Sequence, residues 1–263
     1  MNFQPKLKEV EMKNMVKNIC AAMVISLCAA GHLSATENNP NNDNKFMEEN
    51  LNLTQEWDKT FPQSDKVDHK KITFHNRYGI TLAADLYVPK NVTGKLPAIA
   101  ISGPFGAVKE QASGLYAQTL AERGFLTIVF DPSYTGESSG QPRYVASPDI
   151  NTEDFSAAVD YLSTRDDVDA ERIGILGICG WGGMALNAAA IDTRIKATVT
   201  ATMYDMSRVN ANGYFDSMNA DARHELRRQL NAQRTEDYRN GTFALGGGVV
   251  DPLPADAPQF VKD

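Results

Sequence analysis

From residue 66 onward, the chain alternates between segments with strand periodicity and segments with helical periodicity. Apolar and polar residues alternate on both sides of a turn at 76–79, and Pro89 follows, which predicts an antiparallel hairpin. The later strand segments are nearly continuous apolar runs, as expected for strands buried on both faces. The predicted strands cover residues 71–74, 80–88, 96–102, 126–130, 172–178 and 195–201.

Helices are predicted between the later strands. The first spans 114–123 and ends at Gly124, and the second begins at Thr152 as its N-cap. A third helix, rich in small residues, spans 182–190. A hairpin followed by strand–helix alternation predicts an α/β fold, with a mostly parallel sheet and helices on both faces.

Residues 1–35 have the features of an export signal. Lys13 and Lys17 precede an apolar run at 19–30, which is too short to span a bilayer comfortably. Ala35 supplies the small residue expected at a cleavage site. We therefore expect a signal peptide and an exported protein, periplasmic or secreted, with no membrane contact after cleavage. The alternative is an uncleaved membrane anchor.

Residues 36–65 are polar and rich in asparagine, a composition that forms no packed core. Phe46, Leu53 and Trp57 have helical spacing. The segment is predicted to be a flexible leader that ends in a short helix, and the folded domain is then 66–263.

The composition narrows the classes of function. The chain has 263 residues, with 33 acidic against 26 basic side chains and a net charge of −7. This balance argues against a nucleic-acid partner, because phosphate binding needs a basic surface. The sequence has neither the Cys/His spacing of a metal site nor a glycine-rich phosphate or dinucleotide motif. We therefore expect no metal and no cofactor.

The segment Gly177–Gly183 places a cysteine between a predicted strand and a predicted helix. A G-x-nucleophile-x-G turn at such a junction exposes one side chain, although here Gly182 falls one place later than usual. The positive end of the helix dipole favours an anion at this position. Once the signal peptide is removed, Cys179 is the only cysteine and has no disulfide partner. It is the predicted nucleophile, and the alternative is a buried structural cysteine.

Two loops accompany this motif, Gly103–Gly106 after the third predicted strand and Asp131–Ser138 after the fourth. The arrangement resembles the α/β-hydrolase superfamily over about residues 67–240. It is most similar to dienelactone-hydrolase-like and acetyl-xylan-esterase-like exported bacterial members. The resemblance implies hydrolysis of an ester or lactone bond, with a peptide bond left open, and a small-molecule ester-like substrate.

The resemblance also implies roles for individual residues. The loop after the third strand and the residue after the nucleophile would supply the oxyanion-hole amides, here Phe105 and Gly180. Asp131 would be a structural acid that fixes its loop.

The catalytic acid and histidine of the superfamily follow the nucleophile along the chain. The only histidine after Cys179 is His224, in a polar segment that resembles a cap insertion over about 204–240. A base must lie within hydrogen-bond reach of its partner, a position that a cap histidine does not usually have. Asp205, which follows the sixth predicted strand, is the candidate acid, and His224 is the candidate base.

After residue 240 the sequence becomes a loop rich in glycine and proline, with no further strand. The resemblance implies two more strand–helix units, so we expect a hydrolase domain that lacks its last two strands. A second hypothesis is a catalytically inactive relative that binds a ligand beneath the cap. The sequence leaves the oligomeric state open.

Overall fold

Strands β1 (Val67–His75) and β2 (Thr81–Pro89) form the predicted antiparallel hairpin, with Phe74 opposite Leu82. Asn76 stabilises the turn between them, because its side-chain oxygen accepts hydrogen bonds from the backbone amides of Tyr78 and Ile80, both at 3.0 Å. The computed structural model describes residues 49–246. The predicted signal peptide lies outside the described residues.

The hairpin continues into a six-stranded sheet with the order β1-β2-β4-β3-β5-β6. Strand β2 pairs antiparallel with β4, and the other neighbouring pairs from β4 to β6 are parallel. The carboxyl ends of these parallel strands therefore lie at one edge of the sheet, where ligands bind in open α/β folds. The remaining strands are β3 (Leu96–Ser102), β4 (Leu126–Phe130), β5 (Val168–Ile178) and β6 (Ile195–Ala201).

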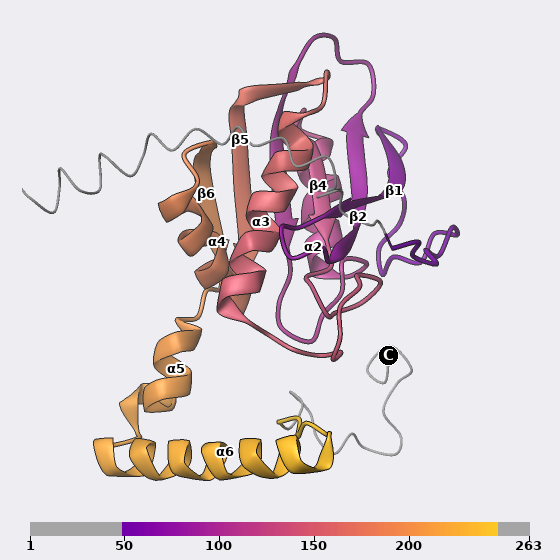
Figure 1. Ribbon diagram of the computed structural model, residues 1–263. Helices are drawn as coiled ribbons and strands as arrows, with labels where there is room; N and C mark the ends of the chain where they lie inside the picture. The colour runs from indigo at the N-terminus through magenta and orange to yellow at the C-terminus, as the bar shows by residue number, and fades with distance from the viewer. Residues whose placement is uncertain (1–48, 247–263) are drawn as a thin grey trace, which may run out of the picture. The chain divides into compact units, whose positions relative to one another are not determined.

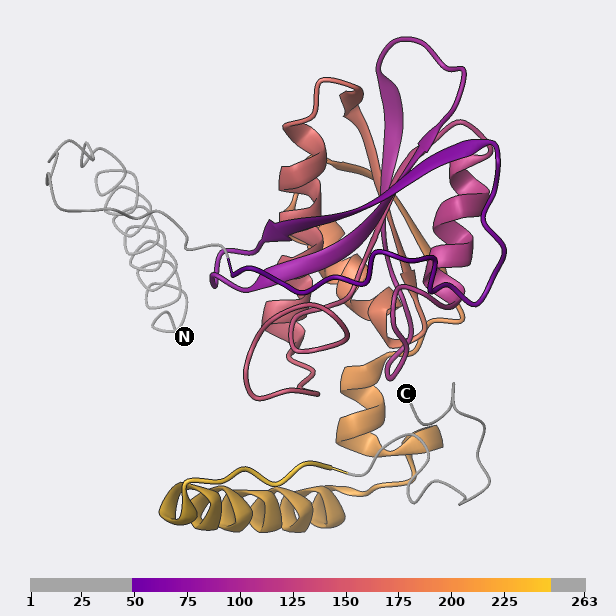
Figure 2. The same ribbon diagram turned by 90° about the vertical axis from the view of Figure 1, so that its right-hand side faces the viewer.

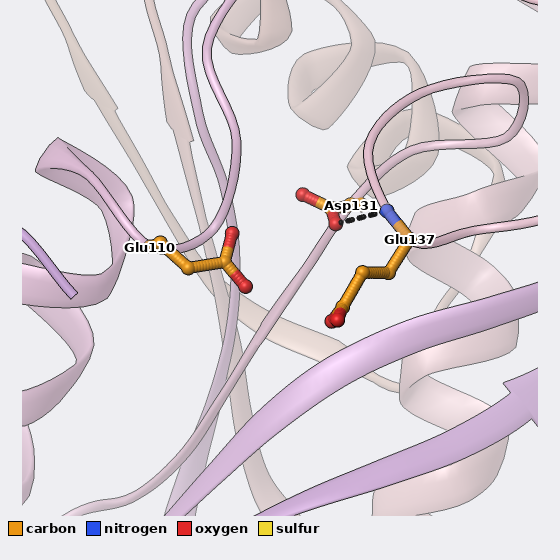
Figure 3. A group of neighbouring side chains, drawn as sticks. All are labelled: Glu110, Asp131 and Glu137. Atoms are coloured by element: carbon orange, nitrogen blue, oxygen red, sulfur yellow. Dashed lines mark hydrogen bonds between the residues drawn. The ribbon is translucent and has the colours of Figure 1, made fainter. Parts of the chain in front are cut away.

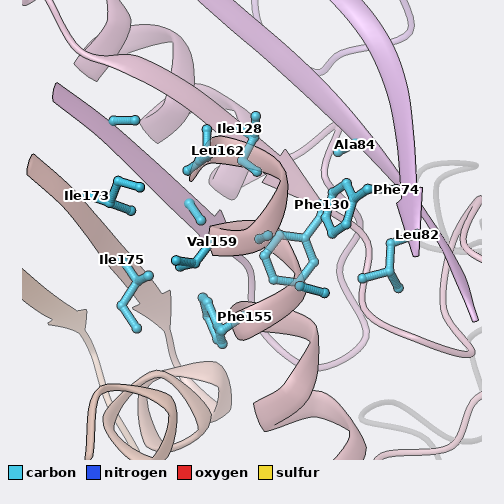
Figure 4. Packing of buried hydrophobic residues seen from close by; sticks show 14 of the residues in the cluster. Phe74, Leu82, Ala84, Ile128, Phe130, Phe155, Val159, Leu162, Ile173 and Ile175 are labelled. Carbon is cyan, nitrogen blue, oxygen red and sulfur yellow. The ribbon is translucent and has the colours of Figure 1, made fainter. Parts of the chain in front are cut away.

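Helices cover both faces of the sheet, as predicted (Figures 1 and 2). Helices α3 (Pro148–Ser163) and α4 (Gly180–Ile191) lie on one face, and α2 (Ala112–Ala121) lies on the other. The larger core cluster forms beneath α3 and α4 (Figure 4). Its fully buried members include Leu82, Leu86, Ile128, Phe155, Val159, Leu162 and Ile173.

The start of α3 differs from the prediction. Its N-cap is Ser147 and its first residue is Pro148, so the predicted cap Thr152 lies one turn inside the helix. Proline is favoured at the first helical position, because its fixed φ suits the helix and its missing N–H would have no intrahelical acceptor. Thr152 is buried, and its hydroxyl has no hydrogen-bond partner in the described part of the chain.

The predicted short helix in the leader is wrong, because residues 49–65 form no helix. This segment packs against the rest of the domain instead. Phe61 is buried, and the Trp57 ring meets the His69 ring edge-on at 5.1 Å between centroids. The ammonium group of Lys59 lies 3.0 Å from the buried Asp85 carboxylate on β2. A charge that deep needs a partner, and Asp85 supplies it.

After β6 the chain forms α5 (Met206–Asn212), a short 3-10 helix (Tyr214–Asp216) and α6 (Ala220–Asn240). The segment predicted to be a cap is therefore helical, although none of these elements contains a buried residue. Of the helices in the described residues, none is both long and apolar enough to span a bilayer.

Candidate functional site

Cys179 lies at the junction between β5 and α4, in a backbone conformation with φ 58° and ψ −124°. Residues other than glycine rarely adopt positive φ, and such strain persists only where the surroundings enforce it. Here the Cys179 amide donates to the Ala201 carbonyl on β6 at 2.9 Å. Its carbonyl accepts from Gly182 at 3.1 Å and from Tyr204 at 3.3 Å. The neighbouring strand and helix thus hold the half-buried thiol in place.

Gly177 makes this sharp turn possible. A Cβ atom at this position would overlap the Trp181 carbonyl oxygen and lie 2.8 Å from the Gly182 Cα. Only glycine allows so close an approach of strand and helix. The glycine two residues before the cysteine therefore has the role that the motif predicts.

The predicted oxyanion-hole residues lie side by side. The Phe105 ring packs directly on the Cα of Gly180, and it lies 5.3 Å from the Trp181 ring between centroids. Gly180 is the first residue of α4, where a helix N–H has no intrahelical acceptor. Across residues 49–246, the Phe105 amide donates no backbone hydrogen bond. Their function as oxyanion donors stays a prediction.

We expect Gly180→Ala to disrupt this arrangement. The added methyl group would overlap the Phe105 ring, so the ring, or the loop after β3 that carries it, must move away from the helix. Loss of one oxyanion donor costs roughly 10²–10³-fold in the rate of acyl transfer. The rate of Cys179 acylation by an activated ester measures the effect. Gly183→Ala is the control for a methyl group on the first turn of α4: Gly183 lines the same cavity as Gly180, but its methyl group would reach only the Tyr204 carbonyl, at 3.5 Å, and would leave Phe105 in place.

Two cavities adjoin the elbow, and both are lined in part by Phe105. The first, here called the methionine-lined cavity, has a volume of about 370 Å³. The second, the tryptophan-side cavity, has a volume of about 540 Å³. The residues that line the methionine-lined cavity include Gly180, Met184, Leu186, Met203, Tyr204, Asp205 and Met206. Those that line the tryptophan-side cavity include Thr135, Tyr144, Trp181 and Leu245.

Asp205, the candidate acid, lines the methionine-lined cavity with Gly180. Asp205 caps α5: its carboxylate accepts from the Arg208 amide at 2.9 Å and from the Ser207 hydroxyl at 3.0 Å. The hydrogen bond from the Arg208 amide, with that from Ser207, lowers the pKa of Asp205. His224 is exposed on α6, and within residues 49–246 no histidine lines either cavity.

A buried ion network supports the loop that carries Phe105. Asp131, Glu110 and Glu137 have carboxylate oxygens within 4.8 Å of one another (Figure 3). The Lys109 ammonium group lies among them, at 2.9 Å from Asp131 and 2.6 Å from each glutamate. Burial on its own raises the pKa of Glu137, but hydrogen bonds from Lys109 and Lys71 outweigh it and lower that pKa to about 2.

Asp131 joins two loops at the carboxyl edge of the sheet. One of its oxygens accepts from the Lys109 amide at 2.8 Å, and the other accepts from the Glu137 amide at 2.9 Å. This confirms the loop-fixing role predicted for Asp131. Sequence reasoning missed Lys109, because a lysine in a polar loop gives no sign that its side chain is fully buried.

Known proteins resemble the chain over much of its length. An uncharacterised protein of Pseudomonas aeruginosa is 63% identical over 244 residues, which are 92% of this chain and 64% of that protein. The crystal structure of a hypothetical protein from the same organism has a TM-score of 0.75 at 64% identity, covering 82% of this chain and 67% of that one. The chain thus spans about two thirds of the length of these relatives.

More distant relatives have named activities. A thiohydrolase of Aspergillus aculeatus is 29% identical over 137 residues, 52% of this chain and 42% of that enzyme. Acetyl xylan esterase 1 from Thermoanaerobacterium shares the fold, with a TM-score of 0.50 at 17% identity over 80% of this chain and 64% of that one. The chain therefore has the α/β-hydrolase fold. The family model described as X-Pro dipeptidyl-peptidase (S15 family) matches residues 78–244, so the chain belongs to that family.

Proposed function

We propose that the domain is a hydrolase whose first step is acylation of Cys179. The Cys179 thiolate attacks the carbonyl carbon of a small ester or thioester. The observation that carries the proposal is the strained backbone of Cys179 at the strand–helix junction, with Phe105 packed against the next residue. A cysteine at this position is also the feature that relates the chain to dienelactone-hydrolase-like enzymes. The thiohydrolase relative supports an acyl-transfer chemistry.

The proposed first step forms an acyl-enzyme. The bond between Cys179 Sγ and the carbonyl carbon forms as the carbonyl π electrons move to oxygen, and the amides of Phe105 and Gly180 stabilise that oxyanion. Collapse of the tetrahedral intermediate expels the alkoxide or thiolate leaving group, which takes a proton from water. The cysteine then holds the acyl group as a thioester.

Hydrolysis of that thioester needs a base to activate water. A positioned base contributes about 10²–10⁴-fold, and within the described residues no histidine lines the cavities beside Cys179. Asp205 is engaged in capping α5, so we leave it and the exposed His224 out of the mechanism. We therefore expect the 263-residue chain to be acylated readily and deacylated slowly.

A stopped-flow measurement with p-nitrophenyl acetate tests this proposal. The expected trace is a burst of one equivalent of p-nitrophenol per protein, followed by a nearly flat phase, with one acetyl group mapped to Cys179 by mass spectrometry. The control is protein whose cysteines have been blocked with iodoacetamide. Absence of a burst would support instead a catalytically inactive relative that binds a ligand. Fast multiple turnover would show that a base activates water at the acyl-enzyme.

The family description favours a second candidate function, the cleavage of X-Pro dipeptides from peptides. Such a substrate carries an N-terminal ammonium group, which needs an anionic partner, and the Asp205 carboxylate lines the methionine-lined cavity. A Gly-Pro p-nitroanilide assay tests this candidate. Release of p-nitroaniline that is lost in Asp205→Asn would favour the peptidase over the esterase.

A further inference from the structure

The methionine-lined cavity opens directly beside the proposed oxyanion hole. Gly180 and Phe105 both line it. A Cβ atom built at Gly180 would lie 3.2 Å from Met206 Cγ, and one built at Gly182 would lie 2.7 Å from Met203 Cγ. The two methionine side chains therefore flank the first turn of α4. Because Gly180, the residue after Cys179, lines this cavity, an acyl group bonded to Cys179 can extend into it.

Methionine and leucine side chains form the adaptable apolar part of the cavity wall, and polar side chains complete it: Asn187, Tyr204, Asp205, Ser207 and Asn210. Met184 is buried and forms part of the wall, whereas Met203, which also lines the cavity, is 44% exposed. Methionine has three rotatable bonds and a polarizable sulfur, so it adapts to flexible ligands of varied shape. A volume of about 370 Å³ falls within the range of small-molecule sites.

The charge around the cavity disfavours anionic ligands. Within residues 49–246, no lysine, arginine or histidine lines it, and its one acidic side chain is Asp205. Because the pKa of Asp205 is lowered, the group stays ionised at neutral pH and repels a second carboxylate. An uncharged apolar chain meets no such cost.

We infer that Met203 and Met206 determine acyl specificity, and that the cavity holds an uncharged, flexible, medium-length acyl chain in preference to an acetyl or a carboxylated one. This inference rests on the proposed acylation of Cys179. The family match alone assigns no function to this cavity.

The test compares the rates of Cys179 acylation by p-nitrophenyl acetate, p-nitrophenyl hexanoate and the mono-p-nitrophenyl ester of adipic acid. Hexanoate is expected to react at least about tenfold faster than acetate, since burial of two methylene groups already corresponds to about that factor. The adipate half-ester, which has the same chain length but ends in a carboxylate, is expected to react more slowly than hexanoate.

Met203→Glu and, separately, Met206→Glu place a carboxylate in the cavity wall and are expected to lower the hexanoate-to-acetate ratio by about tenfold. Ile191→Glu is the matched control, because this residue is 74% exposed at the end of α4 and lines neither cavity. A ratio near one in the parent protein, or a ratio unchanged in both variants, would overturn the inference while the Cys179 burst still stands. Loss of the burst with every ester would instead overturn the proposed function.

Discussion

Replacing Cys179 with alanine is expected to abolish the burst of p-nitrophenol without unfolding the protein. The substitution removes only the sulfur atom, and alanine retains the Cβ atom and the same strain at φ 58°. The side chain is half-buried, so we expect the free energy of unfolding to change by no more than about 1 kcal/mol. The burst amplitude should fall from one equivalent to none. Circular dichroism and urea denaturation would show that the fold is intact.

Cys179→Ser separates the role of the thiol from that of the turn. A serine hydroxyl needs an adjacent base to act as a nucleophile, whereas a thiol ionises in part near neutral pH. Because no histidine in residues 49–246 lines the site, we expect the serine variant to be acylated about 10²–10⁴-fold more slowly. An alanine variant that retains the burst would show that another residue is acylated. A serine variant as fast as the parent would show that a base does reach residue 179.

The elements that the sequence predicted well depend on local patterns. The hairpin, the buried strands and the cysteine at the β5–α4 junction follow from periodicity and from the position of Gly177. These features need little knowledge of distant contacts. A strand buried on both faces is apolar wherever its neighbours come from, and a sharp turn needs glycine for steric reasons.

The ion pairs that the sequence did not predict join residues that lie far apart along the chain. Lys59 and Asp85 are 26 positions apart, and each looks like an ordinary exposed charge until the fold brings them together. One signal was available: Asp85 stands in the middle of an otherwise apolar strand segment, a position that calls for a buried counter-ion. Local spacing predicted a helix in the leader, and contacts with the sheet overrode it.

The position of Phe105 likewise depends on contacts that no local motif predicts. Asp131 holds the loop that carries Phe105 in place, because it accepts hydrogen bonds from Lys109 and Glu137. The side chains of Asp131 and Lys109 are both fully buried. The ion network thus connects the interior of the fold to the geometry of the proposed oxyanion hole.

We expect Asp131→Ala to destabilise the domain by about 3–5 kcal/mol, the range typical of removing one partner from a buried ion pair. The change leaves the Lys109 and Glu137 amides without their acceptor and takes one carboxylate from the Lys109 ammonium group. Asp131→Asn keeps the shape of the side chain but loses its charge, so it separates charge from packing. Urea denaturation measures the free energy of unfolding of both variants.

The matched control is Asp169→Ala, because Asp169 also pairs with a basic residue, Arg172, but on the exposed surface. Screening by water makes such pairs contribute little, so this variant should unfold close to the parent. Under conditions where Asp131→Ala remains folded, its Cys179 should also be acylated more slowly, because the loop holding Phe105 is no longer fixed. An Asp131→Ala variant as stable as Asp169→Ala would show that the two glutamates suffice to hold Lys109 and the loop.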